Sequence, residues 1–200
     1  MSWVRFLQPA PFHSAQRWIG LDTLPDAKAF RSVAANEAVT RLGLLKVEAV
    51  PTIEKLLLRT GEAHPRGVCS SYRSEGRQLS DEEKSKLRIR KNEHMSQGAF
   101  DEITSDGMSS PIRAHELTLL RAAFAVFRHN KALSAQRIIS DHPRTPLSVE
   151  YDVVHPDACA DCLMRHGQPV PSDWGLFPSN ECTCVTAPYG LKLHIDFVAE

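Results

Sequence analysis

The sequence lacks three features that would assign it to a class of protein at once. No apolar run reaches the roughly 18 residues that a membrane-spanning helix needs, so we expect no membrane partner. Neither sign of charge dominates, because 24 lysines and arginines balance 24 aspartates and glutamates. Overall charge therefore gives no hint of nucleic acid or of an acidic membrane, and any basic contact must be local.

The first residues also lack the pattern of a secretory signal. The apolar part of residues 1–9 is short and is interrupted by proline. We therefore expect the chain to fold in a reducing cytoplasm. In that compartment disulfides are rare, and the number of cysteines, five, is odd. The cysteines are therefore better explained as metal ligands plus a spare thiol than as a disulfide framework.

Helical periods occupy much of the chain before residue 141. Apolar residues recur at spacings of three and four over residues 25–41, and Gly43 is placed to end that helix. Pro51 suits the first position of a second helix that runs to residue 59. The strongest period follows Ser110 and Pro111 and lasts for about twenty residues.

Near the C-terminus the hydrophobic period changes to two. Residues 147–153 and 191–197 alternate between apolar and polar, which indicates two strands that flank a cysteine-rich loop. We expect the strands to pair and to bury one face against the helix that starts at Pro111. The predicted fold class is α+β: a mainly helical N-terminal half, then a small antiparallel β element and a cysteine-rich metal-binding loop. We divide the chain into three predicted segments. Residues 1–60 form an N-terminal arm and helices, and residues 61–110 form a polar, basic loop with helices. Residues 111–200 form the module of one helix, two strands and the cysteine site.

Four of the five cysteines form two close pairs in this C-terminal module. Cys159 and Cys162 are separated by two residues, and Cys182 and Cys184 by one. Two such pairs gather four thiolates around one tetrahedral ion, and zinc is the usual occupant of a site with four sulfurs. We therefore predict structural zinc, with three alternatives left open: a histidine (His155 or His166) replacing one thiolate, a pair of disulfides, or four thiols that simply pack.

Three other residues have simpler expected roles. Cys69 stands alone in a polar stretch and is expected to be a spare thiol rather than a nucleophile. Trp174 and Phe177 are expected to cover the metal module.

Basic residues are concentrated in one stretch. Residues 61–79 read as an exposed loop or linker, and Ser80 to Glu83 form a capping box that should start a helix through Lys91. The stretch could contact nucleic-acid phosphates or an acidic protein surface. Alternatively it is a solvated helix face, since no aromatic residues interleave the charges to stack on bases. The candidate contact residues are Arg73, Arg77, Lys84, Lys86, Arg88, Arg90 and Lys91.

A catalytic zinc is the main alternative to a structural one. Zinc nucleobase deaminases combine a Cys-x-x-Cys arm with an upstream His-x-Glu that supplies a ligand and a proton carrier. Here His115 and Glu116 are adjacent, so on a helix their side chains diverge by about 100 degrees. Four thiolates would also fill the coordination shell and leave no position for an activated water. We therefore expect no enzyme, and keep a toxin-like deaminase as the alternative.

The motifs of residues 111–190 occur in a characteristic order. Arg113 to Leu117 open a helix, the arm from Cys159 to Cys162 follows, then Gly167, and finally Cys182 to Cys184 with Pro188 close behind. This order resembles the C-terminal module of the phage Mu F-like head morphogenesis proteins, the minor head proteins of tailed phages. The resemblance implies a structural virion protein, assembled in the host cytoplasm, that associates with portal and capsid proteins and packaged DNA. A zinc-stabilised adaptor outside any phage is a further alternative.

Overall fold

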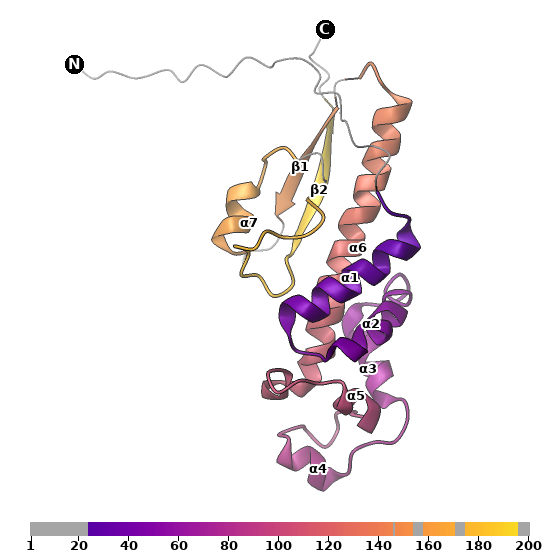
Figure 1. Cartoon of the computed structure of the whole chain (residues 1–200), viewed down its shortest axis with the longest axis vertical. Helices are drawn as coiled ribbons and strands as arrows, with labels where there is room; N and C mark the ends of the chain where they lie inside the picture. Colours follow the sequence, from indigo (N-terminus) through magenta and orange to yellow (C-terminus); the bar gives the residue numbers. More distant parts are fainter. Residues whose placement is uncertain (1–23, 146, 154–157, 171–174, 196–200) are drawn as a thin grey trace, which may run out of the picture.

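The computed structural model describes residues 24–145, 147–153, 158–170 and 175–195. The expected N-terminal arm, His155, Trp174 and the last residues of the second predicted strand lie outside this part of the chain. Figure 1 shows an elongated molecule built along one long helix, α6 (Pro111–Asp141), with short helices around its first half and a strand pair beside its second half.

The first two predicted helices are confirmed. Helix α1 (Ala27–Leu42) begins where the Asp26 carboxylate accepts two backbone N–H groups, and it ends at Gly43, whose φ of 62° permits the left-handed turn. A 3₁₀ turn, η1 (Val47–Ala49), leads into α2 (Val50–Leu57). Both α-helices pack against α6, where their buried apolar residues contribute to the core.

The exposed loop predicted over residues 61–79 is wrong, because α3 (Pro65–Ser74) lies there. Pro65 occupies the first helical position, and the His64 ring accepts the Arg66 N–H. The buried face of α3 includes Val68, Cys69 and Arg73. Two of these three are not aliphatic, so an apolar period was barely visible in the sequence.

The capping box is confirmed, but its helix is shorter than predicted. Both reciprocal hydrogen bonds between Ser80 and Glu83 are present at the start of α4 (Asp81–Lys86). The helix ends before Lys91 because Arg88 has a φ of 56° and the Ile89 N–H reaches back to the Lys84 carbonyl. Helix α5 (Gln97–Asp101) and the 3₁₀ turn η2 (Gly107–Ser109) then lead into α6.

The two predicted strands form the expected antiparallel pair. Strands β1 (Leu147–Val153) and β2 (Tyr189–Ile195) place Val149 opposite Leu193 and Tyr151 opposite Leu191. Val149, Tyr151 and Leu191 are buried and β2 contacts α6, as predicted, but Ile195, which was expected on the buried face, is exposed. The described part of the connection between the strands carries one short helix, α7 (Ala160–Arg165), and all four paired cysteines. The observed class is therefore α+β with a small antiparallel sheet and a C-terminal cysteine cluster.

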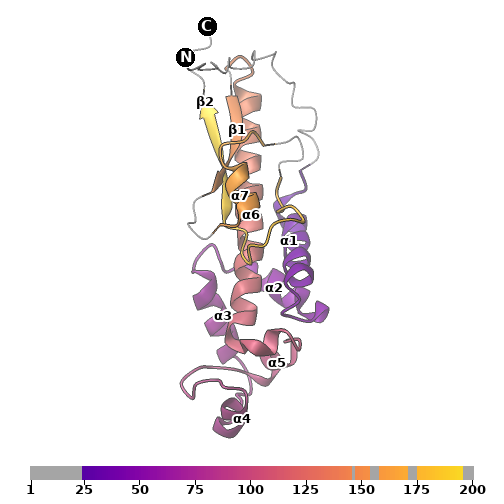
Figure 2. The same cartoon turned by 90° about the vertical axis from the view of Figure 1, so that its left-hand side faces the viewer.

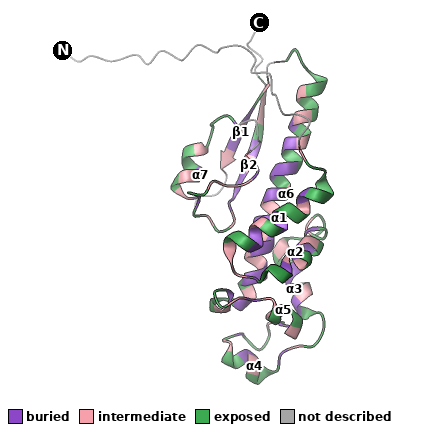
Figure 3. Cartoon of the chain, in the orientation of Figure 1, coloured by how far each residue is buried: buried purple, intermediate pink, exposed green. Residues whose placement is uncertain are grey.

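Buried side chains form one core from α1 to β2, so the described parts of all three predicted segments share it. Figure 2 shows α6 between β2 and helix α1, and Figure 3 shows buried residues along much of the length of α6. Among the described residues, no helix combines the length and apolar character needed to cross a membrane.

Candidate metal centre

The four paired cysteines converge on one point. Their sulfur atoms all lie within 4.8 Å of one another, and the Sγ of Cys182 lies 3.8 Å from that of Cys159 and 3.5 Å from that of Cys162. The Sγ atoms of Cys184 and Cys162 are 3.9 Å apart. Metal–sulfur bonds of about 2.3 Å in a tetrahedron would separate neighbouring sulfurs by about 3.8 Å. The cluster therefore has the dimensions of a four-thiolate metal site.

Local backbone geometry points the sulfurs inward. Cys159 is the N-cap of α7 and Cys162 lies in its first turn, while Cys182 and Cys184 lie in the segment that leads into β2. The Cys159 N–H donates to the Cys184 sulfur at 3.1 Å, which ties one pair to the other. Backbone N–H groups of Cys162 and Thr183 donate to the Cys159 sulfur.

The close packing of the four thiols shifts their pKa values in different directions. Burial acts to raise the pKa of Cys159, but hydrogen bonds, chiefly from the Cys162 and Thr183 N–H groups, outweigh it and lower the pKa to about 6. Burial and the neighbouring sulfurs raise the pKa of Cys162, and burial likewise raises that of Cys182. Four thiolates cannot share this space without a cation, and a bound metal ion would deprotonate them all.

The alternatives to a four-cysteine site were a histidine ligand, a pair of disulfides, or thiols that only pack. The His166 Nδ1 accepts the Val153 N–H at 3.1 Å, so this ring faces β1 rather than the sulfurs. His155 lies outside the described residues. All five cysteines are free thiols, and Cys69 is buried in α3, where burial raises its pKa to about 12. Cys69 is therefore a poor nucleophile, as expected, although it is not in a loop.

A buried arginine of α6 holds the second cysteine pair in place. Arg121 is 1% exposed, and its Nη1 donates to the carbonyls of Cys184 and Val185, both at 3.1 Å. Its Nε and Nη2 bind the Glu37 carboxylate of α1 in a fork, at 3.0 and 2.7 Å. One guanidinium thus joins α6, α1 and the cysteine loop.

A second arginine of α6 holds the rest of the loop. Arg128 is fully buried and donates to the carbonyls of Leu176, Ala187 and Tyr189 at 2.6, 2.9 and 3.3 Å. Its guanidinium carbon also lies 4.2 Å from the centre of the Tyr189 ring, over the ring face. From α1, Arg41 adds bonds to the carbonyls of Asn180 and Cys182.

The charge of Arg128 fits a metal-bound cluster. Among the described residues no carboxylate forms an ion pair with Arg128, and burial lowers its pKa. Tyr189, Glu37 and Cys162, when ionised, act in the opposite direction and raise the pKa of Arg128. Four thiolates around a divalent ion carry two net negative charges, and a buried cation beside them offsets part of that charge. The residues present therefore fit a divalent ion.

The sequence did not lead us to predict that Arg121 and Arg128 hold the cysteine loop. Arg121 and Arg128 are seven positions apart and lie on one face of α6, but arginines on a helix are usually exposed. Phe177 was expected to cover the metal module; its ring stacks on Phe30 of α1, with ring centroids 5.5 Å apart. It therefore fastens the loop to the helical part of the molecule.

The candidate basic contact residues do not lie on one exposed surface. Arg73 and Lys84 are buried, which corrects the expectation that they face a partner. Arg73 binds the Ile112 carbonyl and the Glu116 carboxylate, and Lys84 donates to the Lys91 carbonyl. The other five are exposed, and three of these line one cavity. The three are Lys86, Arg88 and Arg90, whereas Arg77 and Lys91 lie elsewhere.

The pair His115 and Glu116 also has structural partners. His115 is buried with its Nε2 at 2.9 Å from Glu102, and Glu116 pairs with Arg73. Within the described residues, the cysteine cluster includes neither a histidine nor a carboxylate.

Fold and site together define an α+β protein in which a long helix holds a four-cysteine cluster able to bind a metal ion. The chain matches no protein-family model, no curated protein and no solved structure.

Proposed function

We propose that the four cysteines hold one structural Zn²⁺ and that the protein is a structural component of a tailed-phage head. The observation that carries the proposal is the closed set of four converging sulfurs. Cys159, Cys162, Cys182 and Cys184 would fill a tetrahedral shell, so no position is left for a reacting water. Zinc is favoured because soft thiolates select it and its geometry is tetrahedral.

The proposed role of the metal is to give shape to the connection between β1 and β2. Few of its described residues are apolar and buried, and Arg41, Arg121 and Arg128 bind carbonyls in its second half. An ion that joins both cysteine pairs fixes the loop ends, so the arginines meet carbonyls already in position. Metal binding therefore contributes directly to the folding free energy of this module.

Metal content tests the first half of the proposal. Protein purified without added metal should contain one zinc per chain, and Cys162→Ser should lose it. Cys69→Ala is the matched control, because it removes the one cysteine outside the cluster and should keep the zinc. Absence of zinc from the native protein, with the four thiols oxidised in pairs, would overturn the assignment.

The virion assignment rests on the order of motifs over residues 111–190, which resembles the Mu F-like head morphogenesis module. The closed cluster supports a structural role because it leaves no open position for catalysis. Portal and capsid proteins are the proposed partners, with packaged DNA close by and assembly in the host cytoplasm. A deaminase needs an open zinc position and a carboxylate beside it; the described cluster offers neither.

Co-expression tests the second half of the proposal. The protein should co-purify with a ring of the portal protein encoded in the same genome, and it should be found in purified particles. Retention of zinc without binding to portal or capsid protein would instead indicate an adaptor that works outside a phage head.

A further inference from the structure

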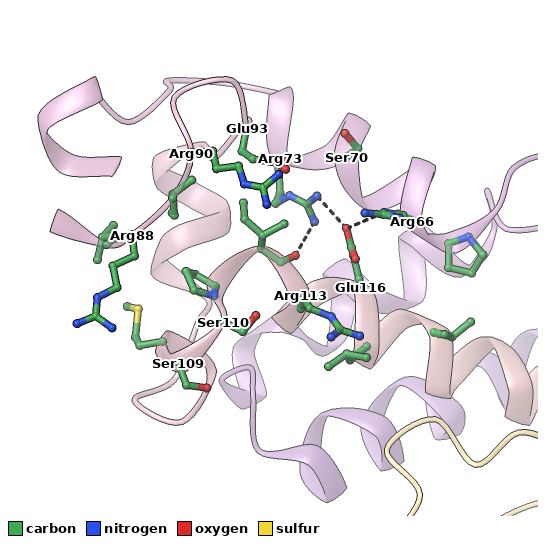
Figure 4. Close-up of a pocket in the computed structure, with 18 of the residues that line it drawn as sticks. Arg66, Ser70, Arg73, Arg88, Arg90, Glu93, Ser109, Ser110, Arg113 and Glu116 are labelled. Atoms are coloured by element: carbon green, nitrogen blue, oxygen red, sulfur yellow. Dashed lines mark hydrogen bonds and ion pairs between the residues drawn. The ribbon is translucent and has the colours of Figure 1, made fainter. Parts of the chain in front are cut away.

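A basic cavity lies at the N-terminal end of α6, apart from the cysteines. Its volume is about 880 Å³, and its walls come from α3, residues 86–93 and the first turns of α6 (Figure 4). That volume is within the roughly 300–1,000 Å³ range of ligand sites. Six cationic side chains and two carboxylates line it: Arg66, Arg73, Lys86, Arg88, Arg90 and Arg113, with Glu93 and Glu116.

The carboxylates leave most of this positive charge unbalanced. Glu116 is shared by Arg73 at 3.2 Å and Arg66 at 4.0 Å. Within the described ranges, Arg88, Arg90 and Arg113 form no ion pair, and all three are exposed. Like charges that line one cavity without counter-charges repel one another, so an anion in the cavity would stabilise the arrangement.

One buried polar group at the cavity also lacks a partner within the described residues. Arg73 is only 2% exposed, and its Nε has no hydrogen-bond partner within the described residues. The 31-residue α6 begins here, its first turn contains no acidic residue, and the Ser110 side chain makes no capping bond. The positive end of the helix dipole therefore adds to the field of the arginines.

Arg88 occupies a position that its backbone does not favour. Its φ of 56° is left-handed, at the point just after α4 where glycine is the usual residue. An arginine there destabilises the local backbone. Its presence is therefore better explained by a ligand that its side chain binds than by a contribution to folding.

We propose that this cavity binds phosphate groups, at least two from one ligand, as a DNA strand or a polyphosphate carries them. Guanidinium groups match the geometry of phosphate oxygens in a fork, and arginines from three segments can contact successive phosphates. No phenylalanine, tyrosine or tryptophan lines the cavity, so the site recognises phosphates rather than bases. The site depends neither on the metal nor on the virion assignment.

Fluorescence anisotropy of a short labelled DNA duplex tests the proposal, with unlabelled triphosphate and polyglutamate as competitors. DNA should bind, triphosphate should displace it, and the apparent affinity should fall steeply as salt rises. If triphosphate binds but DNA does not, the phosphate site stands and its ligand is a free polyphosphate. If neither binds at low salt, or if polyglutamate competes as well as triphosphate, the proposal is overturned.

Arg88→Gly separates binding from folding. Glycine suits the left-handed backbone, so thermal stability should be unchanged or higher, while the affinity for DNA falls by about tenfold and the salt dependence becomes weaker. Arg77→Gln is the matched control, because Arg77 is exposed in the same basic stretch but lies outside the cavity. Equal losses in both variants would show that only overall charge matters, and would refute the site.

Discussion

At the residue scale, the least expected feature is a set of buried and partly buried polar side chains inside the helical half. The Glu102 carboxylate accepts hydrogen bonds from Thr52 and Tyr72 at 2.5 and 2.9 Å and contacts His115 at 2.9 Å. These three partners come from α2, α3 and α6, so one carboxylate joins the three helices. Burial acts to raise the pKa of Glu102, but these hydrogen bonds outweigh it and the pKa lies below its usual 4.5.

We expect Glu102→Gln to lower the free energy of unfolding by about 2 kcal/mol at neutral pH, because bonds to a charged acceptor are lost. A depressed pKa stabilises the folded state above the unfolded-state pKa, and this contribution disappears as pH falls through the folded-state value. The difference between wild type and variant should therefore shrink below pH 4.5. Urea unfolding at several pH values measures it, and a difference independent of pH would contradict the assignment.

Individual residues show where sequence reasoning worked and where it failed. The four cysteines were predicted because their spacing is unusual and their ligand chemistry is specific. Arg73, Arg121 and Arg128 were not recognised as buried, since burial of these cations depends on carbonyl and carboxylate partners that are distant in sequence. The sequence alone contains no signal for such long-range partners.

At the scale of single elements, α6 and the loop that it holds depend on each other. Arg128 donates to two loop carbonyls and to the first carbonyl of β2, and Arg121 donates to two more loop carbonyls. Helices with a regular apolar period and a capping signal, such as α1, were predictable. In contrast, α3 was missed because a cysteine and an arginine are part of its buried face.

Arg128→Met should keep the packing of the side-chain stem but remove a donor from the carbonyls of Leu176, Ala187 and Tyr189, of which Ala187 still accepts the Tyr189 N–H. We expect the free energy of unfolding to fall by about 3 kcal/mol, since each unsatisfied buried group is costly. Arg137→Met is the control, because Arg137 is exposed on the same helix; its effect should stay within about 0.5 kcal/mol. Denaturant unfolding compares the two, and equal effects would refute the role of Arg128.

At the scale of the whole molecule, one core extends through helices and strands, and the cysteine cluster lies at its edge. The helical part has its own buried side chains, whereas the connection between the strands depends on the arginines and the proposed ion. The overall class was predictable from the change in hydrophobic period. The docking of the loop onto α1 and α6 was not, because it depends on polar contacts.

Chelation should therefore open the cysteine loop while leaving most of the helical circular dichroism signal in place. We expect an acidic-residue-specific protease to cleave at the exposed Glu181 only after chelation, and zinc to restore protection. Mass spectrometry of the fragments provides the measurement. Cleavage that is equally fast with and without chelator would show that the loop does not need an ion.

The length of α6 sets the distance between the basic cavity and the strand pair. At about 1.5 Å per residue, its 31 residues extend roughly 46 Å. The basic cavity surrounds its first turns, and the strand pair lies along its second half (Figure 1). A continuous helix held by side chains along its length bends little, so it would act as a spacer. The proposed phosphate site and the strand pair with its cysteine module would therefore be kept at a constant separation.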